Sequence, residues 1–359
     1  MTDGDAVYLP VRLLKVIYLG QVRPIASLLL ANRRTLTELA DVLTKERLAV
    51  QAYAVLNQLN LKSLFPSSAW SLLEDQWQGQ QRRNLELLQE LTRIDRAFAE
   101  AAIPWLYLKG LHFGERFYGG ADRRFTWDLD LMVRPEDCSR ALDLLSRIGF
   151  VKPRGLLGME RFAPKITHAI ECRRSDGLSL DLHWTFRRLP GLQLDREIIW
   201  SESGRTTLGG VAIPVLSDEH TLLQLLLGIA ADVDRGLCRM RALWDVYMML
   251  REVERQDWRG FFARRQSEKS LSLVANALAL VVNQLECHAE FPSLVEALEE
   301  HRGVVVIQDP SHARRILGRG PHGFANRLLY SRWQPLPRRL YWPWWAATLP
   351  MRFLLARKL

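Results

Sequence analysis

The sequence predicts an α+β (mixed α/β) protein in which a small sheet core lies between an N-terminal and a C-terminal helical region. Two observations lead to this fold class. Apolar residues recur every three or four positions in residues 21–102 and again after Ser217, which is typical of helices. Between these regions, short apolar runs alternate with an amphipathic stretch, which is typical of a mixed sheet covered by helices.

The expected elements divide the chain into four parts. We expect an N-terminal helical region in residues 1–102 and the sheet core in residues 103–216. A C-terminal helical domain is expected in residues 217–300, followed by a basic tail rich in Trp and Arg in residues 301–359. Pro66, followed by two serines, is the clearest break within the first helical region.

The elements of the sheet core follow one another in a fixed order. Strands and helices are expected to alternate, and the last two strands are expected to pair. They are a strand at Ile103–Gly110, one or two helical turns at 111–120, a strand at Phe125–Val133, an amphipathic helix at 136–150, and strands at 166–173 and 178–186.

The composition is that of an ordinary globular protein. The 359 residues, 48% hydrophobic and 25% charged, provide material for about two domains. Four cysteines lie far apart without a CxxC pair, which predicts a reducing compartment rather than a disulfide or zinc framework. Because we also find no secretory signal and no uninterrupted membrane-spanning run, we expect a cytoplasmic protein.

The net charge of +9 is concentrated in the tail. Residues 301–359 contain eleven Lys and Arg and a single acid, Asp309, whereas the preceding 300 residues have a net charge of −1. This asymmetry suggests an anionic partner. Tryptophans interleaved with bases fit single-stranded RNA, an acidic peptide or a membrane surface. The alternative is that the tryptophans pack onto the helical body.

Residues 125–133, FTWDLDLMV, place two acids in an otherwise apolar strand. Alternate side chains of a strand face the same side, so Asp128 and Asp130 project together, about 6.6 Å apart. Trp127 and Leu129 are then expected to pack into the core. Burying unpaired carboxylates costs several kcal/mol or more, so a cation is expected between them. Oxygen ligands suit Mg²⁺ or Mn²⁺, which keep positions open for substrate phosphates.

Asp181 is a third acid of the same kind, enclosed by leucines in SLDLHW. If the strands pair, three carboxylates converge on one face of the sheet. Such a site can hold two metal ions, one on nucleotide phosphates and one that activates a hydroxyl nucleophile. Asp128, Asp130 and Asp181 are therefore the catalytic and metal-ligating candidates. The alternative for each acid alone is a residue on the solvent face of a strand.

Four further residues are candidates for nucleotide binding: Lys109, Gly110, Arg124 and His183. A glycine after a strand allows close approach of a phosphate, and a following helix N-terminus favours an anion. Lys109 and Arg124 would neutralise phosphate charge, although both fit ordinary surface bases as well. His183 shares the face of Asp181 and is a candidate for orienting the acceptor or for a base, with a structural polar residue as the alternative.

As a set, these motifs resemble the uncharacterised nucleotidyltransferase family of the polymerase-β-like superfamily. The resemblance rests on LKG, YGG, a base before DLDLMV, a helix ending in GF, and LDLHW, and it covers about Ile103 to Glu254. It implies a polymerase-β-like catalytic core with Gly110 in the turn that opens the site. Asp128, Asp130 and Asp181 would then be its metal triad. Nucleotidyltransferase toxins also share LKG and DxD, but LDLHW fits the first family better.

One departure from the superfamily pattern concerns the turn. Its usual Gly-Ser is Lys109-Gly110 here, so the phosphate-binding Ser is missing and Lys109 would take its place. The resemblance otherwise implies an ATP- or other NTP-binding enzyme, dependent on Mg²⁺ or Mn²⁺, that transfers NMP to an acceptor hydroxyl and releases pyrophosphate. The acceptor is expected to be a small molecule, a peptide or protein, or RNA.

Two other function classes fit parts of the pattern. A DxD glycosyltransferase would use its acids to bind a metal and a nucleotide sugar. A non-catalytic module would bind a nucleotide or a peptide without turnover. The third acid in LDLHW and the LKG turn weigh against the glycosyltransferase.

Overall fold

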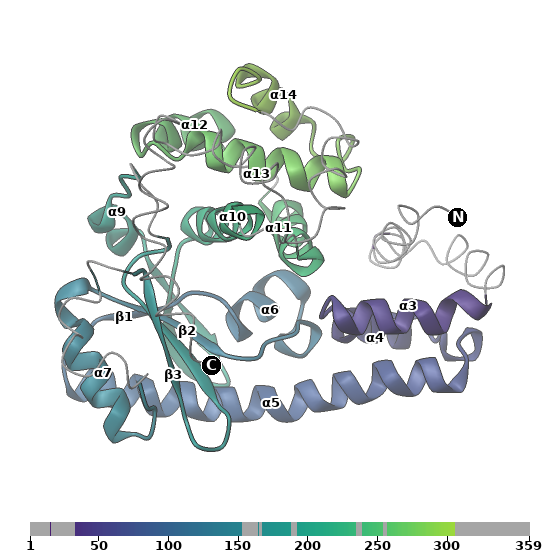
Figure 1. Ribbon diagram of the computed structural model, residues 1–359, viewed down its shortest axis with the longest axis horizontal. Helices are drawn as coiled ribbons and strands as arrows, with labels where there is room; N and C mark the ends of the chain where they lie inside the picture. The colour runs from purple at the N-terminus through teal and green to yellow at the C-terminus, as the bar shows by residue number, and fades with distance from the viewer. Residues whose placement is uncertain are drawn as a thin grey trace. The chain divides into compact units, whose positions relative to one another are not determined.

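The structure, a computed structural model, describes residues 33–152, 167–187, 192–234, 239–253 and 257–305, and singly Lys15 and Pro164 (Figure 1). The expected helix before residue 33 and nearly all of the basic tail lie outside the described residues. The chain divides into two compact units. The first unit comprises Met1–Gln89, Gly110–Trp127 and Arg239–Trp244, and the second comprises Glu90–Lys109, Asp128–Cys238 and Asp245–Leu359.

The first unit is helical where it is described, as the sequence predicts. Helix α5 begins directly after Pro66, the predicted break, and passes into the second unit after Gln89. Leucines spaced three or four residues apart are buried along α3 and along α5. The helices are α3 (Arg33–Lys45), α4 (Ala49–Gln58), η1 (Lys62–Leu64), α5 (Ser67–Glu100), α6 (Leu111–Tyr118) and η2 (Ala121–Arg123).

Polar side chains of α5 hold the segment that leads toward the DxD strand. Gln80 Nε2 donates to the carbonyl of Thr126 at 2.7 Å, and Arg83 Nη2 donates to the carbonyl of Trp127 at 2.9 Å. The Trp127 side chain is 52% exposed, so the prediction that it packs into the core is wrong. The strand begins only at Leu129, and the Trp127 ring lies against the Arg83 guanidinium, 4.9 Å from it.

The second unit contains a six-stranded mixed sheet in the order β3-β4-β2-β1-β6-β5. β2 pairs antiparallel with β1 and parallel with β4, and β3 and β5 are the two edge strands. Four of the strands confirm the sequence prediction. The strands are β1 (Trp105–Tyr107), β2 (Leu129–Val133), β3 (Ala169–Arg173), β4 (Ser179–His183), β5 (Gly204–Leu208) and β6 (Val211–Val215).

The hairpin of β5 and β6 is absent from the sequence prediction. Its two strands pair antiparallel, with Leu208 opposite Val211. Gly209 and Gly210 form the connection with φ values of 54° and 84°, a left-handed conformation that glycine adopts without strain. β6 pairs parallel with β1, so the hairpin extends the sheet on the side away from β2.

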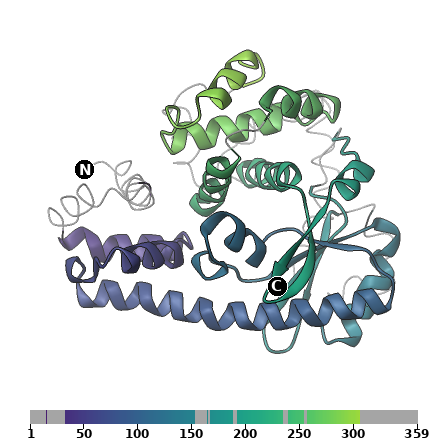
Figure 2. The ribbon, with the colours of Figure 1, turned by 180° about the vertical axis from the view of Figure 1, so that it is seen from behind.

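Helices cover the sheet of the second unit. Figures 1 and 2 show α10, α12, α13 and α14 to one side of the sheet and α7 to the other. In the part of the chain that the structure describes, no helix combines the length and apolar character needed to cross a membrane. The helices are α7 (Cys138–Arg147), preceded by η3 (Pro135–Asp137), α9 (Arg196–Ser201), α10 (Asp218–Asp234), α12 (Trp258–Ser267), α13 (Leu271–Gln284) and α14 (Pro292–Glu300); α11 (Met240–Glu252) begins in the first unit.

The fold is therefore the mixed α/β architecture that the sequence predicts, with helical segments before and after the sheet along the chain. Its central feature for function is the pairing of β2 with β4. Their register sets Asp130 opposite Asp181 and Leu131 opposite Leu182. Both leucines are fully buried, so the alternation of each strand turns the two acids onto the other face of the sheet. The boundaries of the four predicted parts stay a prediction.

Candidate active site

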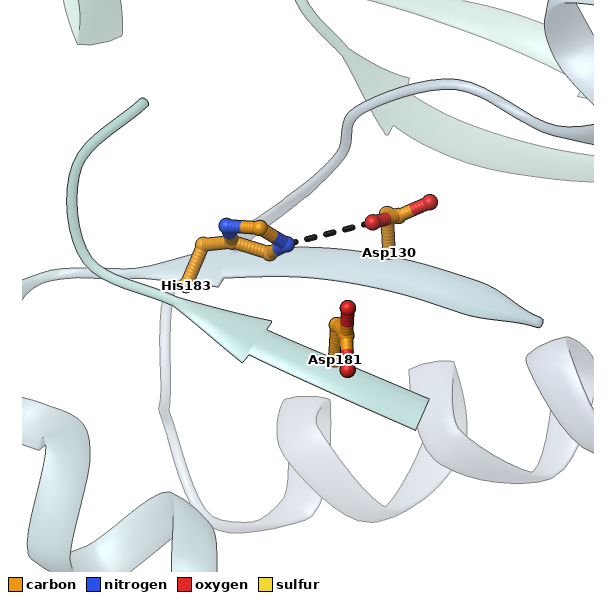
Figure 3. A group of neighbouring side chains, drawn as sticks. All are labelled: Asp130, Asp181 and His183. Carbon is orange, nitrogen blue, oxygen red and sulfur yellow. Dashed lines mark hydrogen bonds and ion pairs between the residues drawn. The ribbon is translucent and has the colours of Figure 1, made fainter. Parts of the chain in front are cut away.

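Asp130 is the second residue of β2 and is only 3% exposed. Both of its carboxylate oxygens have partners. Lys109 Nζ lies 3.2 Å from Oδ2, and His183 Nε2 lies 3.1 Å from Oδ1 (Figure 3). Burial alone would raise the pKa of Asp130, but the charge of Lys109 and the hydrogen bond from His183 outweigh it and lower that pKa. Asp130 is therefore an ionised carboxylate in a buried position.

The position of Lys109 follows from the pairing of β1 with β2. Tyr107 lies opposite Leu131 in the antiparallel ladder. The next residue, Leu108, donates its backbone N–H to the carbonyl of Asp130 at 3.0 Å. Lys109 follows the carboxyl end of β1. Its ammonium contacts the Asp130 carboxylate, and about a third of its side chain is exposed. A cation in this place compensates the burial of the acid.

Asp181 is the register partner of Asp130 on the neighbouring parallel strand. Burial, reinforced by the nearby charge of Asp130, raises the pKa of Asp181 to about 6. The pKa values of the two carboxyl groups are thus shifted in opposite directions, although the residues are neighbours on adjacent strands. A divalent ion between them would relieve the repulsion that raises the second pKa.

Asp130, Asp181 and His183 form one compact group (Figure 3). Each offers one ligand atom, and these atoms all lie within 4.8 Å of one another. Two carboxylate oxygens and an imidazole nitrogen are a donor set that a divalent ion accepts. The residues present therefore fit the metal that the sequence analysis expects.

Asp128, the first acid of the DxD pair, lies directly before β2 and is partly buried. Its negative charge contributes to the raised pKa of Asp181, so it acts on the same carboxylate as Asp130 does. It does not belong to the compact group formed by the other two acids and His183. Its role as a metal ligand stays a prediction.

Gly110 and Arg124 belong to the first unit, where Gly110 precedes α6 and Arg124 follows η2. Gly110 has φ 85° and ψ −125°, which a residue with a side chain rarely adopts. Arg124 is buried, with its guanidinium 5.0 Å from the Phe113 ring and a long hydrogen bond of 3.5 Å to the carbonyl of Gly110. This burial favours a bracing role in the turn; the expected phosphate contacts of both residues stay predictions.

Two features of the site escaped the sequence analysis. Glu171 on β3 lies opposite Asp181, which makes a row of three acids across β3, β4 and β2. The sequence feature that could have revealed Glu171 is an acid between Ile170 and Cys172 in an apolar strand.

The second feature is His168, which lies beside His183 with ring centroids 5.9 Å apart. Arg187 Nη1 lies 2.8 Å from His168 Nε2. No sequence spacing predicts this second contact, because it joins residues across a strand pair.

The site combines a buried anion of fixed charge, a second acid that titrates near neutrality, and a lysine at the sheet edge. Together these groups can bind a divalent ion and a phosphate ester and can accept a proton from an attacking hydroxyl. This arrangement is compatible with metal-assisted transfer of a phosphate-containing group.

Comparison with known proteins makes the class specific. The family model described as "Uncharacterised nucleotidyltransferase" matches residues 32–303, about three quarters of the chain. The chain belongs to this family and is a nucleotidyltransferase. The predicted resemblance is thereby confirmed, and nucleotidyl transfer is favoured over the glycosyltransferase and the non-catalytic module.

Two solved structures are similar to this chain. The solution structure of the antibiotic-resistance factor ANT(2'')-Ia is 14% identical, with a TM-score of 0.33, over 60% of this chain and 98% of that chain. The crystal structure of an antigenic nucleotidyltransferase-like protein from Paracoccidioides brasiliensis is 16% identical, with a TM-score of 0.32, over 58% of this chain and 89% of that chain. A comparison with curated proteins finds no match.

Proposed function

We propose that the protein transfers NMP from an NTP such as ATP to an acceptor hydroxyl, with release of pyrophosphate, and that it needs Mg²⁺ or Mn²⁺. The observation that supports this most is the register of Asp130 and Asp181 on adjacent parallel strands, with His183 completing a compact donor group. When bound there, a divalent ion would neutralise phosphate charge and lower the pKa of the acceptor hydroxyl.

The residues of the chain would divide the work. Asp130 and Asp181 would hold the ion, and Asp128 would contribute a further carboxylate. Asp181 would also help to deprotonate the acceptor hydroxyl. Lys109 would bind the phosphates in place of the serine usual in the superfamily, since its ammonium already faces the acidic site.

The remaining assignments follow from position. Gly110 would let a phosphate approach the backbone at the start of α6, and Arg124, buried beneath that turn, would hold it in shape. His183 would contact the nucleotide or its metal. The acceptor is expected among small molecules, peptides or proteins, and RNA. Three described cysteines are free and buried, which fits the cytoplasm that the sequence predicts.

The proposal is tested by changing the acid at the centre of the site. The protein is incubated with mixed NTPs and, in parallel, with nucleotide sugars, each with Mg²⁺ or Mn²⁺ and a panel of sugars, nucleosides, hydroxyl-bearing peptides and RNA, and products are identified by mass spectrometry. We expect a mass gain of one nucleotide on one acceptor class. Asp130→Asn should lower the rate by at least 10³-fold, because an amide no longer provides the charge that holds the ion.

A matched control makes the same chemical change away from the site. Asp143 on α7 is 62% exposed, and Asp143→Asn should retain the wild-type rate. The far-UV circular dichroism spectra of both variants should match that of the wild type. Full activity in a folded Asp130→Asn variant, or a product that carries a sugar instead of a nucleotide, would refute the proposal.

A further inference from the structure

His183 stands where a third metal ligand would stand. Its Nε2 belongs to the same group of ligand atoms as the carboxylates of Asp130 and Asp181, all within 4.8 Å of one another. Figure 3 shows the imidazole edge that carries Nε2 turned toward Asp130, with Asp181 on the neighbouring part of β4. A nitrogen donor is thus part of a site that the sequence describes by its acids alone.

The distance between His183 Nε2 and Asp130 Oδ1 fits direct coordination of one ion by both atoms. In an octahedral site with ligand distances of about 2.0–2.2 Å, neighbouring donor atoms lie about 2.8–3.1 Å apart. His183 Nε2 lies 3.1 Å from Asp130 Oδ1, so the pair spans one edge of such an octahedron. An ion can therefore bind both atoms without a change of strand register.

The imidazole is held in place before any ion binds. His183 is 7% exposed and ends β4, between Met132 of β2 and Ala169 of β3 in the ladder. The ring of His168 lies against it at a centroid distance of 5.9 Å. Its Nδ1 is buried and forms no hydrogen bond with the described residues. If Nε2 binds an ion through its lone pair, the proton of the neutral imidazole is on Nδ1.

We propose that His183 binds the metal directly through Nε2 and makes the site select Mn²⁺ over Mg²⁺. The proposal rests on the metal-dependent function proposed above and adds a ligand and an ion to it. Mg²⁺ prefers oxygen ligands in a near-ideal octahedron, whereas imidazole best suits Zn, Cu, Fe and Ni. Mn²⁺ suits carboxylate oxygen and, as a transition-metal ion, binds imidazole nitrogen more readily than Mg²⁺ does, so between these two ions the donor set favours Mn²⁺.

A different role for the same atom has a different consequence. If Nε2–H only donates a hydrogen bond to Asp130, His183 orients that carboxylate and never touches the ion. Loss of the histidine would then weaken Mn²⁺ and Mg²⁺ alike. Direct coordination instead predicts a loss confined mainly to Mn²⁺, together with a magnetic coupling between the ion and a ring nitrogen.

The test measures metal binding to the full chain. Mn²⁺ affinity is followed by the electron paramagnetic resonance signal of the free ion, and Mg²⁺ affinity by competition against Mn²⁺. We expect Mn²⁺ to bind the wild type at least tenfold more tightly than Mg²⁺. His183→Asn should lower Mn²⁺ affinity at least tenfold and Mg²⁺ affinity less than threefold. Equal losses for the two ions would overturn the proposal in favour of the orienting role.

Pulsed electron paramagnetic resonance of bound Mn²⁺ gives a second readout that needs no variant. A directly bound imidazole should produce a ¹⁴N hyperfine coupling in the wild type. His168→Asn, the matched control on the neighbouring ring, should keep it, and His183→Asn should lose it. Bound Mn²⁺ without nitrogen coupling in the wild type refutes the ligand even if His183→Asn does not fold. If transfer is intact in that case, the proposed function stands while this inference fails.

Discussion

At the scale of single residues, the site holds one buried and one half-buried acid whose pKa values are shifted in opposite directions. The pKa of Asp130 is lowered by Lys109 and His183 in spite of burial, whereas burial and Asp130 together raise the pKa of Asp181 to about 6. Environments that shift the pKa values of two neighbouring carboxyl groups in opposite directions are typical of sites that use one group as a fixed charge and the other in proton transfer. The same difference predicts opposite contributions of the two carboxylates to the free energy of unfolding.

Asp181→Asn should stabilise the metal-free protein. At pH 7.5 the ionised Asp181 side chain has a folded-state pKa above its unfolded value of 3.8, so its charge opposes folding. Removing that charge should raise the free energy of unfolding by about 1–3 kcal/mol. Asp130→Asn, the same change one strand away, should lower it, because the pKa of Asp130 is shifted in the opposite direction. Urea unfolding in the presence of EDTA measures both variants, and destabilisation by Asp181→Asn would contradict the assignment.

The contact between Lys109 and Asp130 should show strong coupling. Lys109→Met leaves the Asp130 carboxylate buried with only His183 beside it, so we expect a loss of about 1–3 kcal/mol in the free energy of unfolding. In the double variant with Asp130→Asn the charge is gone, and much of that loss should disappear. A double-mutant cycle from denaturant unfolding measures the coupling. Additive effects of the two changes would show that the ion pair contributes nothing.

At the scale of elements, periodicity alone predicted β1 to β4 and the helical segments before and after the sheet along the chain. The face shared by Asp128 and Asp130 stays a prediction, because Asp128 precedes the strand. The prediction failed at Trp127, because the strand was expected to begin before Leu129, where it actually begins. The β5–β6 hairpin was detectable from its Gly-Gly connection between β-branched runs. The pairing of His183 with Asp130 was not, since it depends on the register between β2 and β4. The sequence thus pointed to Asp130, Asp181 and His183, which the structure brings together, but not to the contacts among them.

The N-terminus of α10 should make stability depend on pH. Ser217 caps the helix by accepting the backbone N–H of His220, and its Oγ lies 2.9 Å from Nδ1 of the same residue. Burial lowers the pKa of His220 to about 4 from 6.5. The unfolded chain therefore binds a proton between pH 6.5 and 4 that the folded chain excludes, and stability falls as pH falls through this range.

The size of this effect follows from the shift in pKa. Between pH 7 and pH 5, His220 should account for a loss of about 2 kcal/mol in the free energy of unfolding. His220→Gln should flatten that part of the stability profile. Urea unfolding of both proteins at half-unit pH steps provides the comparison. An unchanged slope between pH 5 and 6.5 in the variant would assign the acid sensitivity to other groups.

At the scale of the whole molecule, catalytic and basic features occupy different parts of the chain. The family match ends at residue 303, and all the candidate site residues lie between 109 and 183. The segment from residue 301 onward carries a net charge of +10, against −1 for everything before it. Residues 110–127, which include α6, belong to the first unit, and the candidate residues Lys109 and Asp128 stand directly before and after this segment.

Removal of residues 306–359 should separate transfer from polyanion binding. Because the site lies entirely before the cut, we expect metal-dependent transfer to a small-molecule acceptor to change less than threefold. Retention on immobilised heparin should fall, with elution at clearly lower salt. The removed segment contains most of the surplus bases, and bases bind a polyanion by releasing its counterions. Transfer kinetics and salt elution of the full-length and shortened chains measure the two effects side by side. Loss of transfer with unchanged heparin binding would reverse the assignment and place the tail in catalysis instead of partner recognition.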